Sequence, residues 1–324
     1  MKKFILKSII YGFLILLLVE VFVRAFHLYT EDPPRYIDAY GVEKRVPHHE
    51  GYAVTGNRNQ NFSKFHINAS GFNSHREFNP SEHTFEVALI GDSFIEGFHQ
   101  DFYNSIGKKI EAQLPQVHVY QYGYAGYDLA NQMHLVHAYE EQFKAIDEII
   151  YYLNYESDLD RGVYEPNYDR INMLRSTPFK IRDQIKILAY GSKIGVLEPL
   201  KRLVSGQAFE NKNEGYETNK VTPYSIKEQR LKDLQRLENF KSLMRLYGFD
   251  KTKTTFLLDS RTTSDSFLAY CQQENIAYID FAPAFKASKT STNLIYDWHW
   301  NNHGRELIAK VISNYINSKH KQLK

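Results

Sequence analysis

From residue 85 onward, short apolar runs alternate with stretches whose apolar positions recur at helical spacing. Strands buried on both faces read as continuous apolar runs, so this pattern predicts strands and helices in turn. The expected strands cover residues 85–90, 117–122, 148–153, 254–258 and 276–281. The expected helices cover residues 105–114, 128–141, 225–247 and 264–274, with a last helix from about residue 304. The alternation predicts an α/β fold, a three-layer α/β/α sandwich around a parallel sheet.

Two segments interrupt this alternation. Residues 27–84 are polar with scattered His and Asn, and they predict an irregular lead-in apart from a small turn or hairpin at residues 67–73. Residues 160–222 are polar with only short apolar clusters, which is typical of an insertion or lid. The expected organisation is therefore an N-terminal segment of residues 1–26, the lead-in, and one domain over residues 85–320 that carries the insertion.

The first 26 residues indicate a membrane segment. Lys2, Lys3 and Lys7 precede an apolar stretch over residues 9–23 that only Glu20 interrupts. A basic start before an apolar run is typical of a cleaved signal peptide or of an uncleaved anchor. Because no small-x-small cleavage site follows, we expect an uncleaved single-pass anchor with the lysines cytoplasmic. The rest of the chain would then lie in the periplasm or outside the cell.

The composition of the chain indicates which classes of binding partner to expect. The 324 residues include 40 basic and 38 acidic side chains, so the net charge is +2. A chain so close to neutral lacks the excess of basic residues that nucleic-acid binding requires. The 24 Tyr and 21 Phe residues supply core, and the Tyr excess also fits a wet stacking surface such as a carbohydrate cleft. The single cysteine, Cys271, forms no intrachain disulfide and is expected to be a small buried hydrophobe on a helix.

One candidate for chemistry follows the first strand of the domain. The run Gly91-Asp92-Ser93-Phe94 places a hydroxyl where a strand gives way to a helix. A serine needs an adjacent base to act as a nucleophile, and backbone N–H groups at such a turn can hold an oxyanion. Taken alone, the run also fits an ordinary helix cap in which Asp92 closes the turn.

The counterpart lies about 200 residues further on, in Asp297-Trp298-His299. Here a carboxylate two residues from an imidazole could fix the ring tautomer and stabilise the imidazolium. His303 stands four residues after His299, a spacing that also suits a metal ion, but no third ligand with suitable spacing is evident. We therefore expect neither a metal nor another cofactor, and the two motifs together predict a hydrolase or acyl-transfer site.

These motifs, in this order, resemble the SGNH/GDSL hydrolases. The matching residues are Gly91-Asp92-Ser93-Phe94, Gly123-Tyr124-Ala125-Gly126, Asp297-x-His299-Trp300-Asn301-x-x-Gly304 and the upstream Asn68-x-x-Gly71-Phe72. The resemblance covers roughly residues 65–315 and is greatest to bacterial membrane-anchored members and acyltransferase relatives with an Asp-x-His-Trp motif. It implies that Ser93 is the nucleophile, that His299 is the base and that Asp297 orients His299.

The resemblance also implies an oxyanion hole, and here the chain departs from the family. Two arms would be the backbone N–H groups of Ser93 and Gly126. The family's third arm is an Asn after the third strand, but Glu156 or Ser157 stands where that Asn is expected, and Asn154 comes a residue or two early. Either Asn154 serves from a shifted loop, or the hole has two arms.

The acid also differs, because many members place it three residues before the His, where Tyr296 stands. Asp297 fits the Asp-x-His variant, with Asp280 at another strand end as an alternative. The predicted function is an acyl hydrolase that forms an acyl-Ser93 intermediate and acts on small esters or on O-acyl (O-acetyl) groups of cell-surface carbohydrate. The alternatives are an O-acyltransferase of the same fold and a non-catalytic surface protein that binds glycan or a partner.

Overall fold

The computed structural model describes residues 1–56, 59, 61–81, 83–196 and 226–320. Its contacts divide the chain into two compact units. The smaller comprises residues 1–32, 54–61 and 168–223, and the larger comprises residues 33–53, 62–167 and 224–324. Of the expected domain of residues 85–320, residues 85–167 and 224–320 fall in the larger unit, and residues 168–223 fall in the smaller one.

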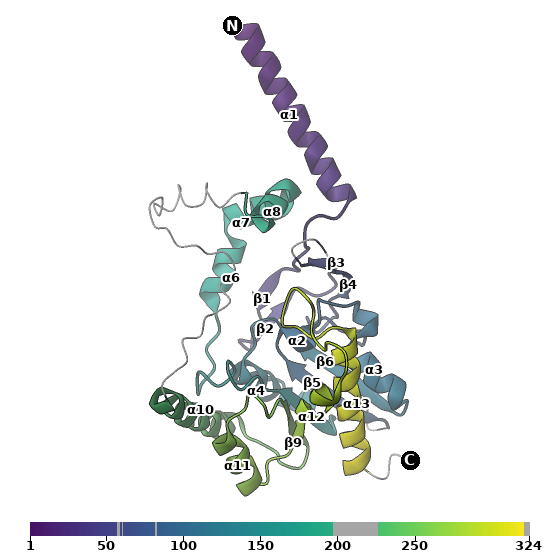
Figure 1. The fold of residues 1–324 in the computed structure, drawn as a ribbon, viewed down its shortest axis with the longest axis vertical. Coiled ribbons are helices and arrows are strands. Elements are labelled where there is room, and N and C mark those ends of the chain that lie inside the picture. Colours follow the sequence, from purple (N-terminus) through teal and green to yellow (C-terminus); the bar gives the residue numbers. More distant parts are fainter. Residues whose placement is uncertain (57–58, 60, 82, 197–225, 321–324) are drawn as a thin grey trace. The chain divides into compact units, whose positions relative to one another are not determined.

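A five-stranded parallel sheet forms the centre of the larger unit (Figure 1). Its strands are β5 (Phe85–Gly91), β6 (Val117–Gly123), β7 (Glu148–Tyr152), β8 (Thr254–Leu258) and β9 (Tyr278–Asp280). They lie in the order β6-β5-β7-β8-β9. All five strands were predicted, although β9 is shorter than the pattern suggested. The chain order reverses between β5 and β7, and at such a point the C-terminal edge of an open α/β sheet forms a crevice.

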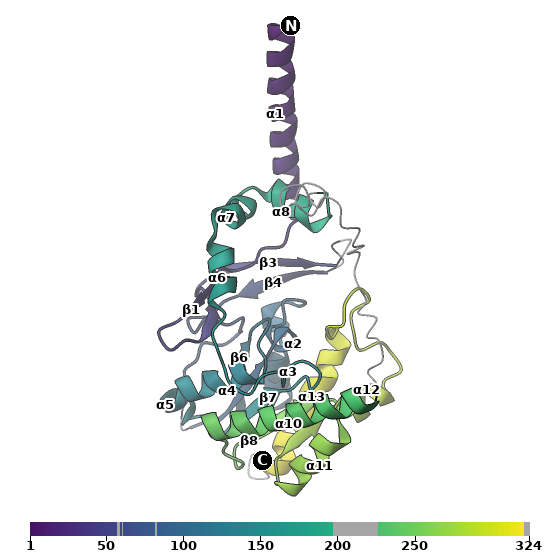
Figure 2. The ribbon, with the colours of Figure 1, turned by 90° about the vertical axis from the view of Figure 1, so that its left-hand side faces the viewer.

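Helices cover both faces of this sheet. Alternate strand side chains such as Ala88 and Ile90 pack on the side of α4 (Leu129–Ala138), α10 (Ile226–Tyr247) and α11 (Asp265–Gln273). Figure 2 shows α10 alongside α4. The intervening side chains, such as Val87 and Leu89, pack on the side of α3 (Ile106–Gln113), α12 (Ala282–Ala287) and α13 (Asn302–Lys319). The predicted three-layer sandwich is confirmed.

The prediction of one helix over residues 128–141 is wrong in detail. The backbone leaves helical geometry at Tyr139 (φ −117°, ψ 29°), so α4 ends at Ala138 and a separate turn, α5 (Glu140–Phe143), follows. Two short helices complete this unit: α2 (Ser93–Glu96) and the 3₁₀ helix η1 (Phe102–Asn104).

The prediction of an irregular lead-in is also wrong at four short strands. They are β1 (Arg35–Ile37), antiparallel to β2 (Glu43–Arg45), and β3 (Glu50–Thr55), paired with β4 (Asn61–His66). The whole of β2 is charged and yet buried, because Lys44 pairs with Asp38 at 2.9 Å and Arg45 pairs with Glu96 at 2.9 Å. The expected turn after β4 is confirmed by an antiparallel bridge between Ile67 and Asn73.

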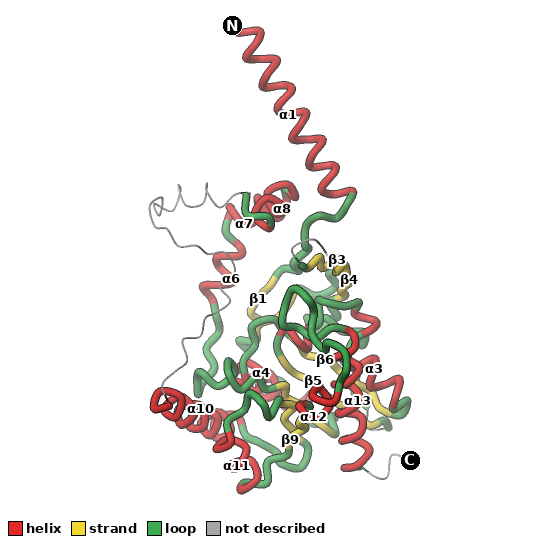
Figure 3. Tube along the Cα trace, viewed as in Figure 1, coloured by secondary structure: helices red, strands yellow, loops and turns green. Residues whose placement is uncertain are grey.

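The smaller unit holds α1 (Lys2–Ala25), α6 (Tyr168–Arg175), α7 (Thr177–Gln184) and α8 (Lys186–Lys193), drawn as helices in Figure 3. By length and composition α1 could cross a membrane, with a mean hydropathy of 2.3 over an 18-residue window, and a signal sequence would pass the same test. Helices α6 to α8 occupy part of the expected insertion; residues 197–222 of that insertion lie outside the described residues.

The acidic residue inside α1 has hydrogen-bond donors from a distant helix. Glu20 accepts from the backbone N–H groups of Lys186 (3.0 Å) and Ile187 (2.7 Å), the first two residues of α8. It also accepts from Arg24 Nε at 2.7 Å. The first N–H groups of any helix lack an intrahelical partner, so Glu20 caps α8.

Candidate active site

Ser93 is placed by a sharp turn from β5 into α2. A Cβ atom on Gly123 would lie 1.9 Å from the backbone nitrogen of Glu96, and one on Gly91 would lie 2.5 Å from a side-chain carbon of Ile95. Glycine at both strand ends therefore lets α2 approach the sheet. Asp92 Oδ1 accepts a hydrogen bond from the N–H of Phe94 at 2.8 Å, which is the helix-capping role the sequence suggested. Ser93 is half-buried at the C-terminal edge of the sheet.

The segment with Asp297 and His299 is a loop between α12 and α13, drawn green in Figure 3. Trp300 anchors it, because its buried indole packs against four aromatic rings: Phe94, Tyr152, Phe281 and Phe285. The Trp of the Asp-x-His-Trp motif is thus a core residue that fixes the loop to the packed aromatic side chains of the domain.

The residues after Trp300 join this loop to α13. Asn301 caps α13 by accepting from the N–H of Gly304 at 2.9 Å, and its Nδ2 donates to the carbonyls of Ser291 (2.7 Å) and Asn293 (3.0 Å). A Cβ atom on Gly304 would lie 2.2 Å from the carbonyl oxygen of Thr292, so only glycine fits.

The structure brings Ser93, His299 and Asp297 together. His299 Nε2 lies 2.8 Å from Ser93 Oγ, and His299 Nδ1 lies 2.5 Å from Asp297 Oδ1. The backbone N–H of His299 also donates to Asp297 Oδ1, at 2.6 Å. The imidazole thus connects the hydroxyl to the carboxylate, within the hydrogen-bond reach that a nucleophile and its base require.

Asp297 sets the proton positions in this chain. Burial opposes ionisation, but hydrogen bonds from His299 and His99 hold the pKa of Asp297 well below its usual range. An ionised carboxylate only accepts hydrogen bonds, so His299 carries its proton on Nδ1. In the neutral ring the Nε2 lone pair then faces Ser93 Oγ and is ready to take its proton.

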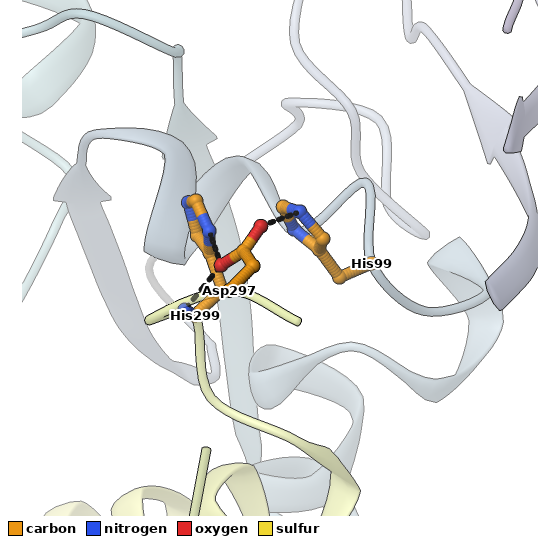
Figure 4. A group of neighbouring side chains, drawn as sticks. All are labelled: His99, Asp297 and His299. Carbon is orange, nitrogen blue, oxygen red and sulfur yellow. Dashed lines mark hydrogen bonds and ion pairs between the residues drawn. The ribbon is translucent and has the colours of Figure 1, made fainter. Parts of the chain in front are cut away.

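A second histidine, His99, contacts the same carboxylate (Figure 4). His99 Nε2 lies 3.2 Å from Asp297 Oδ2, and the His99 and His299 rings stack with centroids 4.0 Å apart. The side chain of His99 is only 11% exposed, although no motif in the sequence singled this histidine out. Gly97 ends the one-turn helix α2 in a left-handed conformation (φ 71°) and turns the chain back, but a glycine at this position does not by itself show which residue reaches Asp297.

The alternatives for the acid and for a metal pair lie elsewhere. Asp280 Oδ1 accepts from the N–H groups of Ser260 (3.1 Å) and Ala282 (2.9 Å), so it caps the turn after β9. His303 Nε2 lies 2.9 Å from Ser288 Oγ. It follows the start of α13 while His299 precedes that helix, so the two histidines do not share a helix face.

Gly126 lies in the turn that follows β6, the strand next to β5. The register pairs Gly91 with Gly123, and the N–H of Tyr124 donates to the carbonyl of Gly91 at 3.0 Å. Gly126 is exposed and has φ +97°, a conformation that favours glycine. Within the part of the chain that the structure describes, the N–H groups of Ser93 and Gly126 donate to no other residue.

Asn154 follows β7 on the other side of β5, where Ile90 pairs with Tyr151. Its Oδ1 accepts from the N–H of Glu156 at 3.3 Å, and its own N–H donates to Asp158 Oδ2 at 2.9 Å. Among the described residues, no hydrogen bond joins Asn154 to Ser93 or His299. The structure places it at the same sheet edge without showing a catalytic contact.

Two further carboxyls near the site are deeply buried. Burial raises the pKa of Asp92 to about 6, and it raises the pKa of Asp158 well above its usual range. Neighbouring negative charges add to the effect of burial. The charge of Asp92 raises the pKa of Asp158, and the charge of Glu96 raises the pKa of Asp92. The sequence assigned Asp92 a structural role but gave no sign of this burial.

Comparison with known proteins adds fold-level resemblances. No family model matches the chain, and no curated protein matches it. Many similar solved structures are described as GDSL or SGNH lipolytic hydrolases. One is a lipolytic protein of the G-D-S-L family from Veillonella parvula, at 12% identity, with 71% of this chain and 97% of that chain covered and a TM-score of 0.39.

Two others carry the name of an activity. A lipase/acylhydrolase from Enterococcus faecalis is 11% identical, with 73% of this chain and 97% of that chain covered and a TM-score of 0.42. A catalytic mutant of an acetylxylan esterase from Geobacillus stearothermophilus is 12% identical, with 72% and 94% covered and a TM-score of 0.32. At these values the resemblance assigns no residue a role, and the contacts among the side chains carry the functional conclusion.

Proposed function

We propose that this chain is a serine acyl hydrolase of the SGNH type. The observation that carries the proposal is the continuous hydrogen-bonded connection from Ser93 Oγ through His299 to Asp297, with distances of 2.8 Å and 2.5 Å. These residues come from the two ends of the domain, and a binding module needs no such alignment. Ser93 is the nucleophile, His299 the general base and Asp297 the residue that orients His299.

The proposed reaction proceeds through an acyl-enzyme. Ser93 Oγ attacks the ester carbonyl carbon while its proton moves to His299 Nε2, and the carbonyl oxygen becomes an oxyanion. The backbone N–H groups of Ser93 and Gly126 are two proposed donors for that oxyanion, with the Asn154 amide as the proposed third. The alcohol leaves with the proton from His299, and water then releases the acid by the same steps in reverse.

An O-acyltransferase is the second candidate, because the acyl-Ser93 intermediate is shared. In that case a sugar hydroxyl, rather than water, gives its proton to His299 and accepts the acyl group. We propose O-acyl (O-acetyl) groups on cell-surface carbohydrate as the substrate. The indole of Trp298, between Asp297 and His299 in the chain, is 84% exposed and offers a stacking face for a sugar.

The proposed location is the outer face of a cell membrane. An uncleaved α1 with Lys2, Lys3 and Lys7 on the cytoplasmic side would hold the rest of the chain in the periplasm or outside the cell.

The Tyr excess lends less support to a carbohydrate cleft than the sequence suggested, because many tyrosines of the sheet and its loops are core residues: Tyr120, Tyr122, Tyr124, Tyr127, Tyr151, Tyr152 and Tyr155.

The test uses the full-length chain in mild detergent with p-nitrophenyl acetate and acetylated xylan as substrates. We expect Ser93→Ala and His299→Ala to lower turnover by at least about 10³-fold. His303→Ala is the matched control and retains turnover. Equal ester cleavage by the parent and Ser93→Ala, together with no acyl transfer to added glycans, would contradict the proposal and leave the non-catalytic binder.

A further inference from the structure

We propose that His99 is a positioning residue that fixes the Asp297 carboxylate by donating a hydrogen bond to its second oxygen, a role that rests on the proposed function of Ser93. The two carboxylate oxygens have different partners: Oδ1 accepts from His299, and Oδ2 lies 3.2 Å from His99 Nε2 (Figure 4). A carboxylate held at both oxygens cannot rotate away from His299.

Asp297 needs such a second contact because of where it lies. Its side chain is 26% exposed, and its neighbours Ile295 and Trp298 are among the most exposed apolar residues of the described chain. Local packing therefore does little to fix the Asp297 side chain within its loop. His99 comes from a different part of the domain, the turn after α2, so it ties the carboxylate to the element that carries Ser93.

Burial favours the neutral form of His99, which can donate one hydrogen bond. Burial lowers the pKa of His99, and the nearby charges of His299 and Arg305 act in the same direction, while Asp297 opposes them. Arg305 reaches the site from α13 with a buried guanidinium, and burial lowers the pKa of Arg305 only to about 10, so it stays a cation. The neutral His99 ring then places its proton on Nε2, facing the carboxylate. Its Nδ1 is buried without a partner among the described residues, so no competing hydrogen bond favours the other tautomer.

The same three side chains could suggest a metal site, because their ligand atoms lie within 4.8 Å of one another. The ring geometry argues against it. A metal bound by histidine lies in the plane of each ring at about 2.0–2.1 Å from the nitrogen. The His99 and His299 planes differ by only 24° with centroids 4.0 Å apart, so the two planes do not meet within a metal–nitrogen bond length. The arrangement is that of one carboxylate between two imidazole donors.

The experiment compares substitutions at residue 99 that place a hydrogen-bond donor at different distances from the backbone. The amide of Gln reaches the position of imidazole Nε2, whereas the shorter amide of Asn ends near Nδ1. Full-length parent, His99→Gln, His99→Asn, His99→Ala and Ser93→Ala are treated with diisopropyl fluorophosphate. The reaction forms a bond from Ser93 Oγ to phosphorus and releases fluoride, and His299 takes the serine proton. Intact-mass spectrometry gives the labelling rate without knowledge of the natural ester, and thermal unfolding checks the fold.

We expect His99→Ala and His99→Asn to label about tenfold or more slowly than the parent, by analogy with the loss of side chains that orient the ligands of metal sites. His99→Gln should label within about threefold of the parent. Equal rates for the parent and His99→Ala would overturn the role of His99 alone. Equally slow labelling of the Gln and Ala variants would also overturn it, because a donor at Nε2 would then not matter. A parent that is not labelled at Ser93 would overturn the proposed function itself, and the role of His99 with it.

Discussion

The Oε2 atom of Glu96 accepts a hydrogen bond of 3.0 Å from the backbone N–H of Ala125, the residue before Gly126. Glu96 is the last residue of α2, which begins with Ser93, so this bond connects the serine's helix to the turn of Gly126. The other oxygen, Oε1, accepts from Arg45 Nε at 2.9 Å, and both side chains of this ion pair are buried. One carboxylate thus links β2, α2 and the loop after β6.

We expect Glu96→Gln to lower the free energy of unfolding by about 3 kcal/mol or more, because it breaks the buried ion pair between Glu96 and Arg45 by removing one of its two charges. Ester turnover measured well below the unfolding temperature should fall as well, since the turn before Gly126 loses its fixed position. Thermal unfolding and p-nitrophenyl acetate hydrolysis measure the two effects. Glu141→Gln is the control: its pair with Lys144 is exposed, and such pairs contribute about 1 kcal/mol at most. A Glu96→Gln protein as stable as this control would rule out the proposed linkage.

Asp297→Asn should reduce kcat by about 10³- to 10⁴-fold with little change in KM, because an amide neither fixes the His299 tautomer nor stabilises the imidazolium. Asp280→Asn is the matched control, since Asn still accepts the two backbone hydrogen bonds of that turn and activity should stay within a few fold. Steady-state kinetics on p-nitrophenyl acetate distinguish the two. The reverse result would show that Asp280 is the acid.

The stability of the protein should depend on the ionisation of Asp92. Its pKa of about 6 in the folded chain lies above the unfolded value of about 3.9, so the folded state binds this proton more tightly. The resulting stabilisation is complete below about pH 4 and is lost as the pH rises through about 6, a change of about 2–3 kcal/mol for a shift of this size. Asp92→Asn removes this dependence and can still accept from the N–H of Phe94.

We therefore expect Asp92→Asn to unfold at a higher temperature than the parent at pH 7, with the difference shrinking toward pH 4.5. Melting curves of both proteins across this range provide the measurement. Parallel profiles would mean that Asp92 is not the group that titrates.

Cys271 should report unfolding. It is buried on α11, as the sequence suggested, and burial raises the pKa of its thiol to about 12. Because the thiolate is the reactive form, a thiol reagent such as dithionitrobenzoate should label the protein only after denaturation. Stoichiometric labelling of the folded protein would show that α11 opens readily.

The sheet was predictable because each of its strands is buried on both faces and reads as a continuous apolar run. Strand β2 was missed because its buried residues are charged; burial there depends on partners such as Asp38 and Glu96 that no local pattern reveals. Helix α7 did carry a signal that the polar composition obscured, since Ser176 and Pro178 form a common helix start.

The site was predictable as far as its motifs extend. Ser93, Asp297 and His299 stand in recognisable runs, and the structure brings them into contact. His99 and Arg305 were missed because each is a single residue whose importance comes from the packing of separate elements around Asp297. The position of Asn154 depends on the loop after β7, where the sequence departs from the family pattern.

The contact between Glu20 and α8 changes what α1 can be used for in experiments. A chain that lacks residues 1–26 has lost Glu20, which accepts from the backbone N–H groups of Lys186 and Ile187, 166 and 167 residues further along the chain. A foreign membrane helix of equal length and hydrophobicity, fused in place of α1, would also lack this acceptor. It would supply one only if it carried an acidic residue at the position of Glu20, one turn before the basic residue at the position of Arg24. Such truncations and fusions, the usual route to a soluble or re-targeted protein, would thus remove the cap of α8 as well as change the protein's location.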